Sequence, residues 1–305
     1  MVLPDFPEFT DIDVSFINIF DDALLRSPLE ASEYTFTNLF AFRKAYDFRV
    51  SRLGDSILIL RTRPPLSVFC PIGTLNLRNI LGDIFSYLRQ HTDEPFLERV
   101  PESVVNRSLR NNALCSIDEE RDHFDYVHDV RELIELQGSK YHEKKNRANK
   151  FRSTYGYEYL QITPDLVDEC LAFEEYWCEV KDCGKYPGLE KERCAILEML
   201  RNFSLLKISG GAIRIEGKIA ALTLGEKISR TTFVIHVEKA NPEFQGLYQV
   251  INQEFLIHEA LDCKYVNREQ DLGIKGLRKA KMSYHPVKFI QKYTVREKQP
   301  MKGNK

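Results

Sequence analysis

The apolar positions between residues 155 and 305 recur with two periods, about two residues and about 3.6 residues. The shorter period predicts strands and the longer one amphipathic helices. Thr163, Pro164 and Asp165 supply a cap and a first-turn proline for the first helix. The predicted order is a strand at 155–159, helices ending at 180 and at 203, strands at 204–208, 212–215, 218–224 and 231–238, a helix at 247–261, a strand at 264–267, a helix at 276–284 and a strand at 287–295.

The first half of the chain repeats much of this order, although the two halves share no obvious sequence. Its predicted elements are a helix at 32–46, strands at 48–53, 56–61 and 67–70, a helix at 75–90, a strand at 96–100, a helix at 102–110 and a strand at 124–130. Such an order predicts an α/β fold with mixed sheets.

A chain of 305 residues is longer than one core usually supports, so two domains are expected. We predict an N-terminal domain at 1–130, a basic linker helix at 131–154 and a C-terminal domain at 155–305. The composition, 43% hydrophobic and 29% charged, is that of a globular protein. The acidic N-terminus lacks a signal-peptide pattern, and no apolar run approaches the roughly 18 residues of a membrane span. The sequence therefore predicts a cytoplasmic protein without a transmembrane segment.

Seven cysteines with irregular spacing favour reduced core thiols over a disulfide framework. Cys178, Cys183 and Cys194 form the one cluster, and they lack the paired C-x-x-C spacing of a structural zinc site. No metal site is therefore predicted.

Charge is distributed unevenly along the chain. The net charge is only -2, but residues 274–305 carry ten Lys and Arg against one Glu. A second basic stretch, 140–152, interleaves its charges with aromatic and amide side chains, as a phosphate or nucleic-acid contact surface requires. The alternative for 140–152 is a solvated helix face. Its candidate binding residues are Lys144, Lys145, Asn146 and Arg147.

The segment 267–284 has the sequence NREQDLGIKGLRKAKMSY. Asp271 suits a tight turn, and Gly276 is expected to permit close backbone approach where a helix begins. Free amides at such a helix start attract anions. Lys281 falls beside the apolar stripe of this helix, where a lysine more often extends toward solvent than reacts. The candidate binding residues here are Asn267, Gly276, Arg278, Lys279 and Lys281.

Glu238 and Lys239 follow the end of a predicted strand, from which a sheet readily presents an acid or base. Asn252 lies on the next predicted helix. The sequence contains no G-x-G-x-x-G, Walker, G-x-S-x-G or H-E-x-x-H motif. This excludes the commonest dinucleotide, nucleotide, esterase and zinc-protease classes.

Three stretches carry a family resemblance: DYVHDVRELIELQGSKYHEKKNRANKF, HVEKANPEFQGLYQVINQEF and NREQDLGIKGLRKAKMSYHP. Together they resemble the uncharacterised bacterial family related to the C-terminal domain of phosphatidylglycerol lysyltransferase. The resemblance implies two tandem GNAT-like domains, a fold shared with the Fem-type peptidyltransferases. It also implies transfer of an aminoacyl group from a charged tRNA to a lipid or cell-wall precursor. The lysyltransferase has a large membrane-spanning region, and this chain has none.

Ordinary GNAT enzymes use acyl-CoA and hold its pyrophosphate on a loop of form R/Q-x-x-G-x-G/A. The corresponding residues here are 243–248, EFQGLY, which match at Gly246 but have an acid at Glu243 and bulky Tyr248 in place of a small residue. The resemblance therefore argues against CoA binding at this loop.

With this resemblance, the predicted function is that of an aminoacyl or acyl transferase acting on an amine or hydroxyl acceptor of a lipid, a cell-wall precursor or a small molecule. Glu238 or Asp271 is the predicted base, and no cofactor is expected besides an aminoacyl-tRNA or acyl-CoA donor. The alternatives are a non-catalytic ligand- or RNA-binding protein and an acyl-CoA-dependent N-acetyltransferase. The oligomeric state stays open. The predicted substrate-binding residues are Lys144, Lys145, Asn146, Arg147, Lys239, Gly246, Tyr248, Asn252, Asn267, Gly276, Arg278, Lys279 and Lys281.

Overall fold

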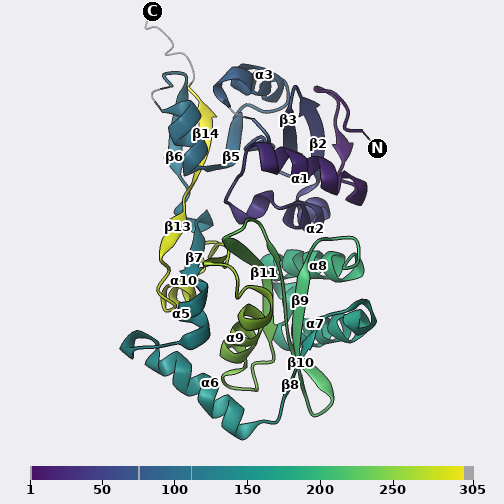
Figure 1. Ribbon diagram of the computed structural model, residues 1–305. Helices are drawn as coiled ribbons and strands as arrows, with labels where there is room; N and C mark the ends of the chain where they lie inside the picture. The colour runs from purple at the N-terminus through teal and green to yellow at the C-terminus, as the bar shows by residue number, and fades with distance from the viewer. Residues whose placement is uncertain (1, 75, 111, 299–305) are drawn as a thin grey trace, which may run out of the picture. The chain divides into compact units, whose positions relative to one another are not determined.

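A computed structural model of the chain describes residues 2–74, 76–110 and 112–298. The chain divides into two compact units, which Figure 1 labels by element. Unit 1 comprises residues 1–124 and 290–305, and unit 2 comprises residues 125–289. Leu75, where a helix was predicted to begin, and residues 299–305 of the predicted C-terminal domain lie outside the described residues.

Unit 1 contains a mixed sheet of order β1-β2-β3-β4-β5-β14-β6, in which β4 and β5 run parallel. The inner strand β3 is buried from Ser56 to Leu60, as its apolar run requires. The Thr35 hydroxyl accepts a hydrogen bond from the Asn38 amide and caps α2. The elements are β1 (Thr10–Asp11), α1 (Ile17–Arg26), α2 (Phe36–Tyr46), β2 (Phe48–Leu53), β3 (Ser56–Arg61), β4 (Ser67–Phe69), α3 (Arg78–Leu88), β5 (Phe96–Pro101), α4 (Glu102–Val104), a π-helical turn η3 (Val105–Leu109), β6 (Cys115–Glu119) and β14 (Lys292–Glu297).

Unit 2 contains a second mixed sheet, of order β13-β7-β12-β11-β10-β9-β8. The inner strand β10 contacts α7 and α9, and residues 220–225 of β10 are all buried, so both faces of the sheet are covered. The elements are β7 (Asp125–Asp129), α5 (Val130–Glu135), α6 (His142–Thr154), β8 (Glu158–Gln161), α7 (Val167–Lys181), the short turn η7 (Cys183–Lys185), α8 (Pro187–Arg201), β9 (Ser209–Ile215), β10 (Lys218–Lys227), β11 (Thr232–Ala240), α9 (Leu247–Glu259), β12 (Tyr265–Asn267), α10 (Lys275–Met282) and β13 (Lys288–Ile290).

Two irregularities of β11 position the residues discussed below. The parallel pairing of β11 with β12 covers only three residues, Thr232 to Val234. Farther along β11, Ile235 pairs with Gly225 and Val237 with Leu224, so His236 is the extra residue of a β-bulge against β10. The second half of β11 therefore presents its side chains where β12 no longer accompanies it.

The structure corrects the predicted domain boundaries. The strand at 124–130 is β7, which pairs with β12 and belongs to unit 2. The predicted linker helix is α6, whose Ala148 and Phe151 belong to the core of unit 2. The predicted last strand is two strands, because β14 pairs with β5 and β6 of unit 1. In unit 1 the fully buried Lys292 of β14 forms an ion pair with Glu33.

Two local predictions are also wrong. Residues 204–208 form a turn, a bend and an irregular segment, and the strand begins only at Ser209. Cys178 and Cys183 form a disulfide, with their Cα atoms 5.0 Å apart, whereas the other five cysteines are free. Spacing alone could not reveal the pair, since the approach depends on how α7 ends. Among the described residues no helix is both long and apolar enough to cross a membrane.

Candidate functional site

Glu238 projects from β11 beyond the part that pairs with β12. Its carboxylate accepts a hydrogen bond from the Asn252 amide at 2.7 Å and one from the Arg268 guanidinium at 2.8 Å. Asn252 lies on α9, and Arg268 directly follows β12. Three elements therefore meet at one carboxylate, whose side chain is only 13% exposed.

Arg268 connects this carboxylate to the basic segments. Its guanidinium carbon lies 4.8 Å from the centre of the Tyr284 ring, and the Lys144 ammonium of α6 lies 4.5 Å from the same ring centre. Burial lowers the pKa of Lys144, and the charges of Arg147 and Arg268 lower it further. The structure thus brings one residue from each of the three predicted segments together: Lys144, Glu238 and Tyr284.

One donor of Arg268 stands out within the described part of the chain. The Nη1 atom is buried and has no hydrogen-bond partner there, while Nη2 is bonded to Glu238. A buried donor left unpaired costs free energy, on the order of 1–3 kcal/mol. A guanidinium donor beside a carboxylate is suited to an oxygen of a bound substrate.

Lys281 of α10 is tied to the backbone that follows β12. Its ammonium donates to the carbonyl oxygens of Arg268 at 2.5 Å and Gln270 at 2.6 Å. Burial is the main cause that lowers the pKa of Lys281 to about 8. Lys281 therefore neither extends toward solvent nor contacts Glu238. It holds in place the backbone that carries Arg268.

Asp271 is held far more completely than a general base requires. Its carboxylate accepts hydrogen bonds from Arg278 at 2.7 and 2.8 Å, from the Gly273 amide at 2.8 Å and from the Tyr126 hydroxyl. Burial opposes ionisation, but these bonds together lower its pKa to about 2. Such a carboxylate is a weak base, so of the two predicted bases the geometry favours Glu238.

The Gly246 turn at the start of α9 is covered by α6. Gly246 has a φ of 97°, and a Cβ atom there would collide with the carbonyl oxygen of Arg147. Phe151 of α6 packs with Leu247 in one buried cluster. The backbone of α6 at Arg147 therefore covers this turn. In GNAT enzymes the corresponding turn holds the CoA pyrophosphate with free backbone amides.

Lys239 and Tyr248 take part in packing against α7. The Lys239 ammonium lies 3.8 Å from the centre of the Trp177 ring and donates to Glu192 at 2.7 Å. The Trp177 indole in turn donates to the Ala240 carbonyl at 3.1 Å. Burial is the main cause that raises the pKa of Tyr248. These contacts join the last turns of α7 to the end of β11.

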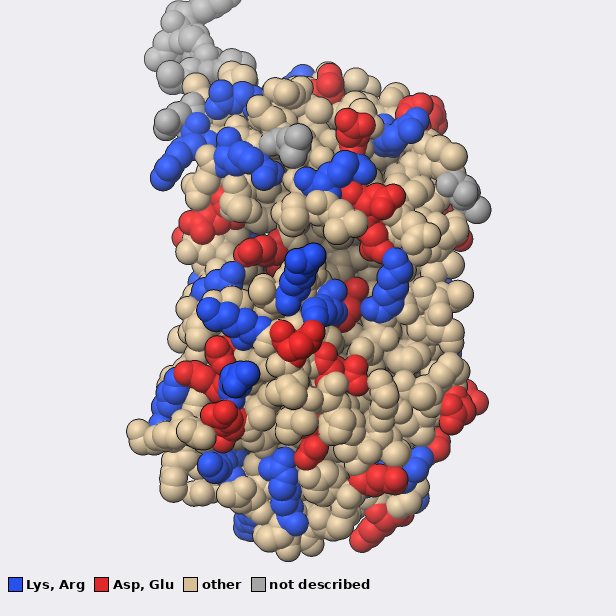
Figure 2. All heavy atoms as spheres, in the orientation of Figure 1, with Lys and Arg blue, Asp and Glu red and all other residues tan. Residues whose placement is uncertain are grey.

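The remaining predicted residues lie apart from Glu238 or serve the fold. Asn267 is buried and donates to Asp125 at 2.9 Å. The predicted close approach at Gly276 is wrong, because a Cβ atom there would meet nothing within 4 Å among the described residues. Lys145 and Lys279 are exposed, Asn146 bonds to His142, and Arg147 pairs with Glu143. On the face shown in Figure 2, acidic and basic side chains are interspersed.

His236 was missed by the sequence analysis. It is the extra residue of the β11 bulge, and its ring nitrogens bond to Glu226 at 2.9 Å and to Glu269 at 2.8 Å. Burial lowers the pKa of His236, but the hydrogen bonds and charges of these two carboxylates outweigh it and raise the pKa to about 10. The protonated ring fastens the bulge two residues before Glu238. The available signal was the pair of polar residues at alternate positions 236 and 238, which interrupts the apolar residues of this strand.

Comparison with known proteins agrees with this architecture. Residues 26–296 match the family described as phosphatidylglycerol lysyltransferase, C-terminal. A crystal structure of a conserved protein of unknown function from Bacteroides thetaiotaomicron VPI-5482 is 33% identical, with a TM-score of 0.88 over 97% of this chain and 100% of that chain. The structure of L-PGS from Bacillus licheniformis is 13% identical, with a TM-score of 0.66 over 99% and 96%. FemX is 8% identical, with a TM-score of 0.54 over 95% of each chain. No curated protein matches the chain.

The two mixed sheets define a protein of the tandem GNAT-like fold class, which confirms the predicted fold. Within that class, the chain belongs to the family of the phosphatidylglycerol lysyltransferase C-terminal domain, as the resemblance predicted. The relative at 33% identity has no stated function, so the family alone does not specify a substrate.

Substitution of Gly246 by Ala should destabilise the protein by about 2 kcal/mol or more, because the φ is positive and the backbone of α6 blocks a Cβ atom. The matched control is Gly276→Ala, which places the same methyl group in open space on α10. It should stabilise the protein by about 0.5–1 kcal/mol through helix propensity. Denaturant unfolding measures both changes, and equal effects of the two substitutions would contradict the packing of α6 on the Gly246 turn.

The raised pKa of His236 makes stability depend on pH. The folded pKa of about 10 lies above the model value of 6.5, so the stabilisation is complete below pH 6.5 and is lost as the pH rises toward 10. The free energy of unfolding of the native protein should therefore fall by roughly 2–4 kcal/mol as the pH rises across this window. His236→Gln should remove that dependence, whereas replacement of the exposed His258 by Gln should keep it. If the native protein had the same stability from pH 6.5 to 9.5, the proposed stabilisation by protonated His236 would be refuted.

Proposed function

We propose that unit 2 transfers an aminoacyl or acyl group from an activated ester to an amine or hydroxyl acceptor, with Glu238 as the general base. The observation that carries the proposal is the pairing of Glu238 with Arg268, whose Nη1 donor is buried and unpartnered within the described residues. A base and an oxyanion donor held side by side are what acyl transfer by direct attack requires.

The proposed reaction needs no covalent enzyme intermediate. Glu238 takes a proton from the acceptor as its nitrogen or oxygen attacks the carbonyl carbon of the donor. The carbonyl oxygen becomes an oxyanion, to which Arg268 Nη1 donates. The bond to the leaving oxygen then breaks, and the proton held by Glu238 returns to that oxygen. Asn252 keeps the Glu238 carboxylate in place throughout.

The donor is proposed to be an aminoacyl-tRNA, as the family resemblance implies. Two features support this choice over acyl-CoA. The Gly246 turn is covered by α6, and Glu243 stands where a donor to phosphate is expected. The ammonium groups of Lys145 and Lys279 are exposed, which suits contact with a phosphate backbone. The acceptor class stays as broad as predicted: a lipid, a cell-wall precursor or a small molecule.

A non-catalytic ligand- or RNA-binding protein is the second candidate. The observation that favours it is that neither of two surface pockets in unit 2, of about 380 and 280 Å³, is lined by Glu238. Under that hypothesis the exposed basic residues bind RNA with a steep salt dependence, and the buried ion pair only stabilises the fold.

The decisive experiment offers the purified protein radiolabelled aminoacyl-tRNA and, separately, labelled acetyl-CoA, each with lipid and amine acceptors. Label should pass from aminoacyl-tRNA to an acceptor. Glu238→Gln should lower the rate by roughly 10²–10⁴-fold, because the amide keeps the shape of the side chain but accepts no proton.

Glu254→Gln is the matched control. Glu254 is also paired with an arginine, Arg152, at 3.1 Å, and it lies on α9 two residues after Asn252. Positions two apart on a helix do not share a face, so transfer should be unchanged. Salt-sensitive tRNA binding without transfer from either donor would favour the binding protein and overturn the transferase.

A further inference from the structure

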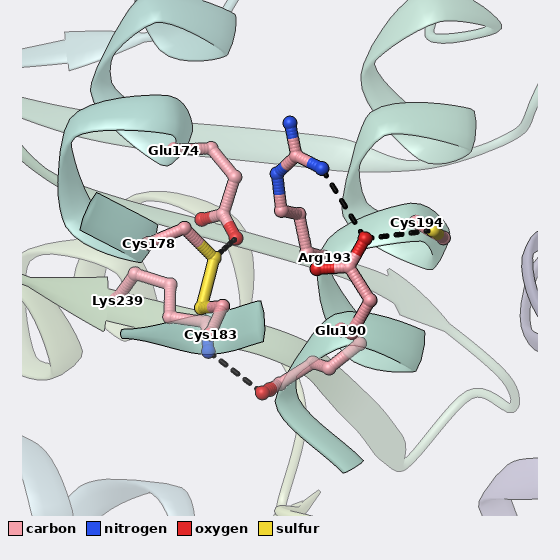
Figure 3. Close-up of a disulfide and its surroundings, with 8 residues drawn as sticks. Glu174, Cys178, Cys183, Glu190, Arg193, Cys194 and Lys239 are labelled. Atoms are coloured by element: carbon pink, nitrogen blue, oxygen red, sulfur yellow. Dashed lines mark hydrogen bonds and ion pairs between the residues drawn. A yellow bond between two sulfur atoms is a disulfide. The ribbon is translucent and has the colours of Figure 1, made fainter. Parts of the chain in front are cut away.

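The disulfide between Cys178 and Cys183 joins the last turn of α7 to the short turn η7. Asp182, the last of the four residues between them, adopts the left-handed conformation with a φ of 55°, which reverses the chain and brings the two sulfur atoms together. Figure 3 shows the bond with the carboxyl group of Glu174 directed at the sulfur of Cys178. Glu174 lies one helical turn before Cys178 on α7.

Glu174 is fully buried, yet its carboxyl group has no hydrogen-bond donor within the described residues. Its Oε1 atom lies 3.8 Å from the sulfur of Cys178, which carries no hydrogen while it is bonded to Cys183. Its Oε2 atom has no partner among residues 2–74, 76–110 and 112–298. The nearby cation Lys239 is already bonded to Glu192. Burial raises the pKa of Glu174 to about 7, and the Lys239 charge offsets this only in part.

This arrangement is costly for a purely structural disulfide. An unsatisfied buried carboxyl group destabilises the fold, and a leucine or glutamine would fill the same space. The carboxyl group acquires a partner only when the disulfide opens, because a Cys178 thiol can donate to Glu174 and a Cys178 thiolate can take its proton.

Both cysteines are buried, with 7% and 3% of Cys178 and Cys183 exposed, but they lie at the wall of an open pocket. A surface pocket of about 380 Å³ is lined by both cysteines. It is also lined by four carboxylates and one guanidinium, those of Glu175, Glu179, Asp182, Glu190 and Arg193. A negative pocket wall repels anionic thiols and favours neutral or cationic ones.

We propose that Cys178 and Cys183 form a reversible thiol–disulfide exchange site, which takes neutral or cationic dithiols through the acidic pocket and uses Glu174 as the proton donor and acceptor of Cys178. The site is independent of the proposed transfer reaction.

One thiolate of the dithiol attacks the sulfur of Cys183, the S–S bond breaks, and the leaving sulfur of Cys178 takes the proton of Glu174. The second thiol of the dithiol, as its thiolate, then attacks the mixed disulfide and releases Cys183, which takes a proton from solvent. The protein gains two electrons, and the dithiol is oxidised to a disulfide. In the reverse direction the Glu174 carboxylate removes the proton of Cys178.

The test measures the rate at which dithiothreitol opens the disulfide in the folded protein, by maleimide labelling and mass spectrometry from pH 5.5 to 9. After correction for the thiolate fraction of dithiothreitol, the rate constant should fall about tenfold or more as the pH rises through 7. Glu174→Gln should react at least about tenfold more slowly at pH 6 and lose the pH dependence. Glu175→Gln, which removes a neighbouring carboxylate that lines the pocket, should keep it.

A second measurement tests the pocket without altering Glu174. The cationic thiol cysteamine should react about threefold or more faster than the anionic 3-mercaptopropionate, each corrected for its thiolate fraction, and the difference should shrink at high salt and in Glu179→Gln. The proposal is overturned if the disulfide resists dithiothreitol until the protein unfolds. It is equally overturned if Glu174→Gln and the native protein share one pH profile.

Discussion

The ion pair between Glu238 and Arg268 is the constraint on which the candidate site depends. Each charge is almost completely removed from water, and removing one partner of such a pair costs about 3–5 kcal/mol. The pair therefore needs neighbours that fix both groups: Asn252 holds the carboxylate, and Lys281 holds the backbone that carries Arg268. The salt bridge between Asp271 and Arg278 braces the turn before α10, from which Lys281 projects. Lys281, supported by the pair of Asp271 and Arg278, thus helps to place one guanidinium.

The same principle acts along β11 itself. A strand that loses its neighbour after three residues and contains a bulge would be a weak support for a reactive side chain. The His236 ring compensates by joining Glu226 of β10 to Glu269 after β12, so three segments are fastened at the point where backbone pairing ends. Precision at Glu238 comes from side-chain bonds at a place where the sheet cannot supply it.

The sequence predicted elements better than it predicted partners. Strands β2 and β3 have the predicted bounds, 48–53 and 56–61, because alternation in β2 and an apolar run in β3 are local patterns. Glu238 and Asn252 were also selected, and they do bond to each other. Arg268 was overlooked inside a segment chosen for its lysines, since what distinguishes it is a contact made across the fold. The sequence also failed to predict that β14 belongs to unit 1 and that Cys178 bonds to Cys183. The first depends on packing between residues distant in sequence, and the second depends on the geometry of one turn.

The indole of Trp177 connects the helix turn that carries the disulfide to β11. Trp177 directly precedes Cys178, and its hydrogen bond ends on the carbonyl of Ala240, two residues beyond Glu238. The last turn of α7 is therefore bonded directly to the carboxyl end of β11. The same turn of α7 thus carries both a half of the disulfide and the hydrogen bond that ties this helix to the strand bearing Glu238.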